Sequence, residues 1–281
     1  MKFTLLAILA FTFFAFQMGH SPKGSWARKI NKQFAHVPSG LVVVGKDTGS
    51  VQAFYISKTE VTNKEYKLFL ADLKAQNRLE EYALCLPDTN AWSTRLKNQF
   101  GSKYQEYYFS HPAYVDYPVV CVSFEAAQKY CEWYTIQMNK KFEGKKTLIF
   151  RLPYREEFLR ACRGDVYVQK FAWKENDVWN KDSLILCNHL HYDESPVSGS
   201  VSDNADVTAP AKSYWPNQFG VYNLNGNVAE MTNKKGIATG GSWRNEAKDV
   251  TNESIMNYET ANPMVGFRMV TTYVNMSCPA K

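Results

Sequence analysis

The side chains best suited to hold a ligand lie in the segment 222–230, whose sequence is YNLNGNVAE. Asn223 and Glu230 carry side-chain oxygens, and a turn can present the backbone carbonyls of Gly226 and Val228 beside them. Hard cations such as calcium prefer a cage of oxygen ligands of this kind. The segment therefore predicts a structural calcium site formed by these four residues. The alternative is that its asparagines only build a turn and that the Glu230 carboxylate is solvated.

Two histidines, His189 and His191, form a second group that could ligate a transition metal. In a loop the two rings diverge unless the backbone is extended, and only Asp193 lies near enough in sequence to add a ligand. A metal role for this pair is therefore not favoured. The chain shows no Ser-His-Asp triad, phosphate-binding loop or carboxylate pair with a distinctive spacing.

The cysteines permit disulfides, because their number is even and the N-terminal sequence, described below, predicts export. They are Cys85, Cys121, Cys131, Cys162, Cys187 and Cys278. Cys131 and Cys162 lie in helix-like segments among apolar neighbours, so simple burial is the alternative for both. No CxxC pair is present, which argues against a structural zinc site.

Composition and the N-terminus indicate an exported globular protein. The 281 residues are 45% hydrophobic and 15% aromatic, which suits a buried core and is unlike a disordered chain. The formal charge of +6 is spread along the chain, so no nucleic-acid partner is expected. Met1-Lys2 and the apolar run Phe3–Phe16 predict a signal peptide over residues 1–20. That run is short for a membrane span, so we expect no transmembrane span after signal removal.

Three helices are predicted to position these residues. Thr62 and Glu65 form a capping box, which predicts a helix that starts there. Its apolar face comprises Tyr66, Phe69, Leu70 and Leu73. A second helix is predicted from Ser123, and its inner face comprises Phe124, Ala127, Cys131 and Tyr134. A third helix is predicted from Pro153 to Gly164, because proline favours the first turn of a helix and glycine its end.

The remaining chain predicts short strands and loops. Gly40–Gly45 and Ala53–Ile56 are expected to form a hairpin across the turn at 46–50, and Gly266–Val274 a last strand. Residues 77–117 lack clear periodicity and contain prolines, so an ordered loop is expected there. The fold class predicted from these elements is α+β with low regular secondary structure.

Several short strings stand in a defined order along the chain: Tyr55–Asn63, Tyr117–Phe124, Arg151–Phe158, Phe219–Glu230, Gly240–Asn245 and Gly266–Arg268. In this order and at these separations they resemble the formylglycine-generating enzyme family, also called the sulfatase-modifying factor family. The resemblance covers about residues 37–270, and it is the ordered series that is specific. It implies one domain related to C-type lectins, with calcium at the four residues of segment 222–230. A second calcium site would use Asn188 and Asp203, although their spacing departs from the family.

The resemblance also implies a reaction centre that this chain lacks. Oxidases of the family convert a cysteine of a client sulfatase to formylglycine, using copper held by two thiolates. The two matching positions hold Asn245 and Val250, and no cysteine lies between Cys187 and Cys278. Neither an amide nor an isopropyl group supplies the soft thiolate that Cu(I) requires, so copper is not expected. The interpretation is a non-catalytic binding or scaffold protein, and the alternative is a formylglycine-generating oxidoreductase acting on sulfatase cysteines.

A narrower likeness indicates the cell envelope. Leu86–Thr89 and His111–Pro118 resemble gliding-motility and type IX secretion lipoproteins that use this scaffold without oxidase chemistry. No cysteine precedes Cys85, so the chain is not expected to be lipidated. We expect an exported protein of the periplasm or cell envelope, linked to gliding motility or secretion, with another envelope protein as partner. Its expected parts are a linker over 21–36, the family domain over 37–274 and a tail over 275–281.

Overall fold

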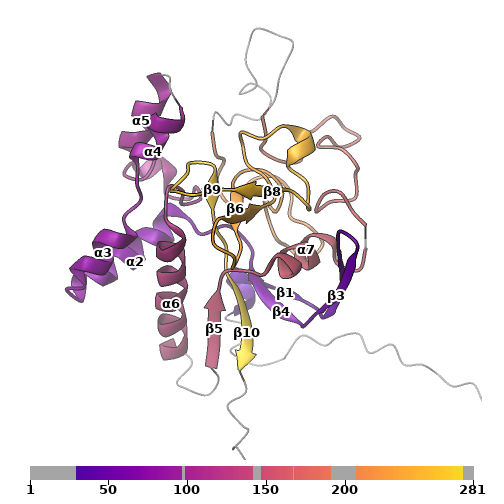
Figure 1. Ribbon diagram of the computed structural model, residues 1–281, viewed down its shortest axis with the longest axis horizontal. Coiled ribbons are helices and arrows are strands. Elements are labelled where there is room, and N and C mark those ends of the chain that lie inside the picture. The colour runs from indigo at the N-terminus through magenta and orange to yellow at the C-terminus, as the bar shows by residue number, and fades with distance from the viewer. Residues whose placement is uncertain (1–29, 97–98, 142–146, 167, 191–206, 275–281) are drawn as a thin grey trace, which may run out of the picture.

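The computed structural model describes residues 30–96, 99–141, 147–166, 168–190 and 207–274 (Figure 1). The predicted signal peptide and C-terminal tail lie outside these residues, as do His191, Asp193 and Cys278. The described part contains two four-stranded sheets, a two-stranded sheet and several helices. This mixture of small sheets and helices confirms the predicted α+β class.

The first sheet joins the two ends of the described chain. Its strand order is β1 (Phe34–Val37), β4 (Phe54–Ser57), β10 (Val270–Val274) and β5 (Thr147–Arg151), all antiparallel. Residues 34–36, which the sequence assigned to a linker, therefore belong to β1 and pair with residues 55–57 of β4. Phe34, Ala35 and Val37 are buried, so their apolar surface holds this strand in the domain.

The predicted hairpin is wrong in its pairing. β2 (Gly40–Val44) pairs with β3 (Asp47–Val51), and β4 joins the first sheet instead. The chain reverses at Gly45, whose φ of +61° suits glycine. Residues 47–50 are exposed and polar, so β3 has no alternation of apolar and polar residues that could have revealed it.

The three predicted helices are confirmed. α2 (Asn63–Ala75) begins at Thr62, and both hydrogen bonds of the Thr62–Glu65 capping box form. α6 (Phe124–Lys141) begins after Ser123, whose hydroxyl accepts from the backbone N–H of Ala126. α7 (Arg155–Arg163) starts slightly later than predicted and ends at Gly164, where φ is +58°. Local capping and apolar periodicity thus determine all three.

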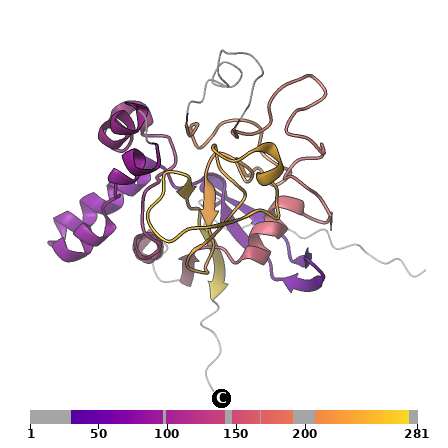
Figure 2. The same ribbon diagram turned by 45° about the horizontal axis from the view of Figure 1, so that its top comes forward.

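The loop predicted over residues 77–117 is wrong, because that segment contains short helices. They are α3 (Leu79–Cys85), α4 (Asn90–Arg95), α5 (Gln99–Tyr107) and the 3₁₀ turn η1 (Pro112–Tyr114). Such short helices hold no more than a few turns, so their periodicity is weak and packing must stabilise them. The Trp92 ring lies 4.9 Å from that of Tyr108 and 5.1 Å from that of Tyr104. Figures 1 and 2 show these helices together along one side of the molecule.

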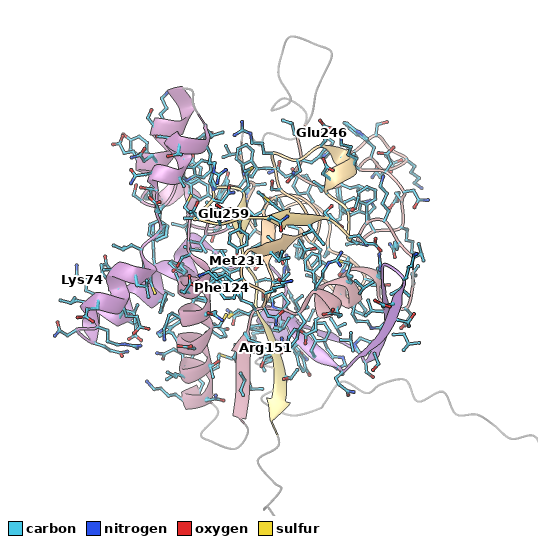
Figure 3. All side chains as sticks on the ribbon, viewed as in Figure 1. Lys74, Phe124, Arg151, Met231, Glu246 and Glu259 are labelled. Atoms are coloured by element: carbon cyan, nitrogen blue, oxygen red, sulfur yellow. The ribbon has the colours of Figure 1, made fainter. Side chains whose placement is uncertain are left out.

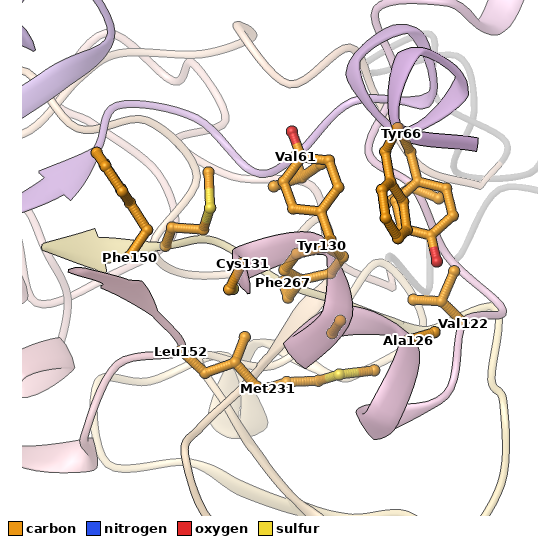
Figure 4. Packing of buried hydrophobic residues seen from close by; sticks show 14 of the residues in the cluster. Val61, Tyr66, Val122, Ala126, Tyr130, Cys131, Phe150, Leu152, Met231 and Phe267 are labelled. Atoms are coloured by element: carbon orange, nitrogen blue, oxygen red, sulfur yellow. The ribbon is translucent and has the colours of Figure 1, made fainter. Parts of the chain in front are cut away.

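An aromatic core lies between α2, α6 and the first sheet (Figure 4). The Tyr66 ring stacks on Tyr130 at 5.6 Å, and Phe267 meets Tyr130 edge-on at 5.5 Å. Each buried ring removes a large apolar area from water, so such pairs dominate the stability of the core. Phe267 directly precedes Arg268, and this packing fixes the position of the arginine described below.

The second sheet positions the predicted calcium-binding segment. Its order is β8 (Ile255–Asn257), β7 (Ile237–Thr239), β6 (Ala229–Met231) and β9 (Val265–Gly266), and β6 and β9 are parallel. Glu230 of β6 lies opposite Gly266 of β9. In Figure 3, Met231 of β6 lies near the middle of the molecule, and Glu246, before the turn η2 (Ala247–Asp249), lies at its edge.

Two further features concern the whole described part. No helix within it is both long and apolar enough to cross a membrane. Its cysteines are all buried: Cys85, Cys121, Cys131, Cys162 and Cys187. Cys131 and Cys162 form no disulfide among the described residues, so burial accounts for both.

Candidate functional site

The segment predicted to bind calcium is a tight and buried turn. Asn223, Gly226 and Asn227 all have φ between +52° and +77°, a region that glycine and asparagine tolerate best. A Cβ atom at Gly226 would collide with the carbonyl oxygen of Asn188. Glycine is therefore required at position 226 both for its conformation and for its space.

Glu230 is bonded to an arginine that the sequence did not single out as its partner. Nε and Nη2 of Arg268 lie 2.5 Å from the two carboxylate oxygens of Glu230. Arg268 also donates to the carbonyl oxygens of Ser57, at 3.0 Å, and Tyr222, at 2.8 Å. Both charged side chains are fully buried. The arrangement is a bidentate buried ion pair, the strongest geometry for these two groups.

A second buried carboxylate, Glu60, lies beside this pair and was also missed. It accepts hydrogen bonds from Nδ2 of Asn227, at 2.8 Å, and more weakly from Nδ2 of Asn223, at 3.4 Å. Burial raises the pKa of Glu60 to about 7, the positive charge of Arg268 opposes that rise, and Glu230 adds to it. Burial likewise raises the pKa of Glu230 against the effect of Arg268. The positive charge of Arg268 therefore acts on two carboxylates, but it forms a direct ion pair only with Glu230.

The turn fits calcium only in part. Asn223, Gly226 and Val228 lie together and offer oxygens of the type that calcium prefers. The Glu230 carboxylate, however, is neither solvated nor open, because Arg268 contacts both of its oxygens. A cation bound through Glu230 would have to share that carboxylate with a guanidinium. Calcium at this turn therefore stays a prediction.

Chelation tests that prediction. If calcium binds only the native protein, its removal by EGTA must lower the melting temperature, since such a ligand at a hundredfold excess over its Kd stabilises by about 2.7 kcal/mol. The measurement is thermal unfolding with EGTA, with calcium and with magnesium in its place. A melting temperature that is the same under all three conditions would contradict the calcium site.

Asn245 and Val250, the positions to which the resemblance assigned the two catalytic cysteines, have structural roles in this chain. Oδ1 of Asn245 accepts from the backbone N–H of Ser242, at 2.9 Å, and from its hydroxyl, at 2.7 Å. Val250 is fully buried in a small apolar cluster with Phe171, Val178 and Cys187. Asn245 thus closes a turn and Val250 fills the core, so neither side chain offers a reactive group.

Cys187 belongs to the same apolar cluster as Val250, and His189 lies beside Cys187. The Cys187 sulfur is 3.7 Å from Nδ1 of His189, and both residues are buried. The rest of the predicted histidine pair, His191 and Asp193, falls outside the described residues, as does Asp203. Asn188 donates to the carbonyl oxygen of Val207 at 2.7 Å. Among the described residues, no three His, Cys, Asp or Glu side chains are grouped so that they could hold a metal.

Aromatic packing covers one side of the region around Asn245. Trp243 is buried, and its ring stacks on Trp92 of α4 at 6.3 Å. Nη1 of Arg244 donates to the carbonyl oxygen of Arg95 at 3.1 Å. Helix α4 is therefore in contact with the segment that carries Asn245. Another tryptophan, Trp215, is exposed, unlike the buried Trp243.

The fold defines a class: a domain with the architecture of the formylglycine-generating enzymes. Residues 20–273 match the sulfatase-modifying factor enzyme 1-like domain. The chain belongs to this family, which confirms the resemblance drawn from the short strings.

The similar proteins include one named as a formylglycine-generating enzyme and one named as an inactive form of it. The chain is 25% identical over 230 residues to the formylglycine-generating enzyme of Bos taurus, covering 70% of this chain and 56% of that enzyme. It is 24% identical over 293 residues to the "inactive C-alpha-formylglycine-generating enzyme 2" of Bos taurus, covering 87% of this chain and 91% of the relative. The chain thus spans little more than half the length of the first relative and nearly all of the second.

Solved structures share the fold at low sequence identity. PvdO from Pseudomonas aeruginosa aligns with a TM-score of 0.56 and 17% identity, over 85% of this chain and 93% of its own. CarF aligns with a TM-score of 0.54 and 19% identity, over 84% of this chain and 97% of its own. At this identity the likeness establishes the fold alone.

Proposed function

We propose that this chain is a non-catalytic binding or scaffold protein built on the formylglycine-generating fold. One observation supports the proposal: Asn245 and Val250 stand where the family resemblance expects the two catalytic cysteines, and both side chains have structural contacts instead. Copper chemistry in the family needs two thiolates, and a turn-forming amide and a core isopropyl group supply neither.

The remaining cysteines of the described part do not replace the lost pair. Burial raises the pKa of the Cys85 thiol to about 12, and it raises the pKa values of Cys131 and Cys162 as well. A thiol must lose its proton to bind copper, so these groups are poor ligands at neutral pH. Cys187 lies beside Val250 but within an apolar cluster. The bovine relative named as inactive, which matches most of this chain, supports the same interpretation.

We expect no formylglycine-generating activity from the full chain. The protein is incubated with Cu(I), oxygen and a peptide carrying a sulfatase cysteine motif, and the peptide mass is measured. The cysteine should keep its mass, whereas an active formylglycine-generating enzyme in the same buffer, the matched control, should convert it. Conversion by this protein would establish the alternative, an oxidoreductase acting on sulfatase cysteines.

We further propose export to the periplasm or cell envelope, with an envelope protein as partner and a role in gliding motility or secretion. The supporting features are the apolar run Phe3–Phe16 and the strings around Leu86 and His111. Alkaline phosphatase is active only in an oxidising compartment. Its fusion after Arg28 should be active, and the same fusion without residues 3–16 should be inactive. Equal activity of both fusions, or none from either, would contradict export.

A further inference from the structure

A cavity of about 400 Å³ lies where the N-terminal segment meets the first sheet and α6. Its walls come from segments far apart in sequence: residues 32–34, 57–61, Tyr134 of α6, the loop around 219–222, and Met269. Neither Asn245 nor Val250 lines it, so it is separate from the family's reaction centre. The volume falls within the range of small-molecule sites, roughly 300–1,000 Å³.

Lysines dominate the charge of this cavity. Lys32, Lys58 and Lys212 all line it, and none is paired with a carboxylate of the described residues. Lys58 is half-buried, and its ammonium donates to the carbonyl oxygen of Asn31 at 2.6 Å. That bond fixes one positive charge at the wall, while Lys32 and Lys212 are exposed at the rim.

The acidic residues of the cavity are already engaged. Glu65 accepts from the backbone N–H and the hydroxyl of Thr62 in the capping box. Glu60 is fully buried and accepts from Asn227 and Asn223. The three lysines outnumber these two carboxylates, so the cavity keeps a net positive charge.

Aromatic rings form the other walls. Phe34, Tyr134, Phe219 and Tyr222 all line the cavity. The Lys212 ammonium lies 5.9 Å from the centre of the Tyr222 ring, so charge and ring face the same space. Tyr134 is held in place because its hydroxyl donates to the Gln33 side chain at 2.9 Å. Flat apolar walls beside cations suit a ligand that combines a ring with an anionic group.

We propose that this cavity binds a small organic anion, a carboxylate or phosphate carried on a ring-shaped body. The lysines recognise the anionic group, and the rings of Phe34, Tyr134 and Tyr222 contact the body of the ligand. This site does not depend on the absence of oxidase activity, because it lies apart from positions 245 and 250. Failure of one proposal therefore leaves the other standing.

Matched ligands test the proposal by isothermal titration calorimetry on the full chain. The probes are 4-methylumbelliferyl glucuronide, the corresponding phosphate, and the neutral glucoside. At least one anion should bind about ten times more tightly than the glucoside, because only the anion accepts charge-assisted hydrogen bonds from the lysines. The tighter of the two anions identifies carboxylate or phosphate as the group recognised. Equal affinity for the glucoside, or no binding of either anion at millimolar concentration, would overturn the proposal.

Lysine variants locate the binding in the cavity. Lys212→Met and Lys58→Met should each weaken binding of the anion about tenfold. Lys248→Met is the matched control, because Lys248 lies outside the cavity and pairs with Glu246. Lys212 is exposed, so its variant should keep the melting temperature of the wild type. Unchanged affinity in the Lys212 and Lys58 variants would place the binding elsewhere and overturn the proposal.

Discussion

Glu230→Gln is expected to lower the free energy of unfolding by about 3–5 kcal/mol. The substitution keeps the shape of the side chain but leaves Arg268 as a buried guanidinium without its partner charge. Breaking a buried ion pair from one side is costly because the remaining charge is shielded from water and has lost its directly bonded partner. Since domains are stable by only about 5–15 kcal/mol, the loss should be visible in urea unfolding and in the melting temperature.

A double-mutant cycle separates the interaction energy between Glu230 and Arg268 from the destabilisation that each substitution causes by itself. Arg268→Met should cost about as much as Glu230→Gln, and the double variant should cost clearly less than the sum of the two. The matched control is Glu125→Gln, which breaks the exposed ion pair between Lys235 and Glu125 and should change stability by about 0–1 kcal/mol. Additive losses at Glu230 and Arg268 would show that the two charges do not stabilise each other. A loss that disappears when EGTA is added would instead indicate that Glu230 acts through calcium.

The parts of the fold that were predicted are those whose signals are local. Thr62 and Glu65 are neighbours on one turn, so their capping box marks the start of α2 without knowledge of the rest of the chain. The helices α3 to α5 carry no such signal, and contacts such as Trp92 with Trp243 stabilise them from a distant segment. Strand β3 was missed for another reason: it pairs locally with β2, but its residues 47–50 are exposed and have no apolar alternation.

The sequence predicted where the candidate site lies but not which side chains contact Glu230 there. The ordered strings located Glu230 and Arg268 separately, but the parallel pairing of Glu230 with Gly266 is what brings the two side chains together. Spacing along one sequence does not reveal that pairing. Glu60 was missed because a carboxylate between Thr59 and Val61 gives no sign of being fully buried. Asn245 and Val250 were informative because the family resemblance assigned cysteine to both positions.

Glu60 should make the stability of the protein depend on pH in an unusual direction. Its pKa is about 7 in the folded protein against 4.5 for the exposed group, so between these values the folded state binds more protons than the unfolded one. Stability from this residue is therefore complete below about pH 4.5 and is lost as pH rises through 7. At about 1.4 kcal/mol per pKa unit, the loss between pH 5 and pH 8 is roughly 2–3 kcal/mol.

Glu60→Gln isolates this effect, since glutamine keeps the shape and an acceptor for Asn227 but has no proton to lose. The charged groups that act on Glu60 are Arg268, whose charge lowers its pKa, and Glu230, whose charge raises it, and both remain in the variant. The difference in unfolding free energy between variant and wild type should therefore shift in favour of the variant by roughly 2–3 kcal/mol from pH 5 to pH 8.

Glu246→Gln, at the edge of the molecule (Figure 3), is the control and should show no such shift. His36, whose pKa burial lowers, is unchanged in both variants and cancels in the difference. A difference that stays constant across this range would mean that Glu60 is already ionised at pH 5, and that Arg268 neutralises both carboxylates at once.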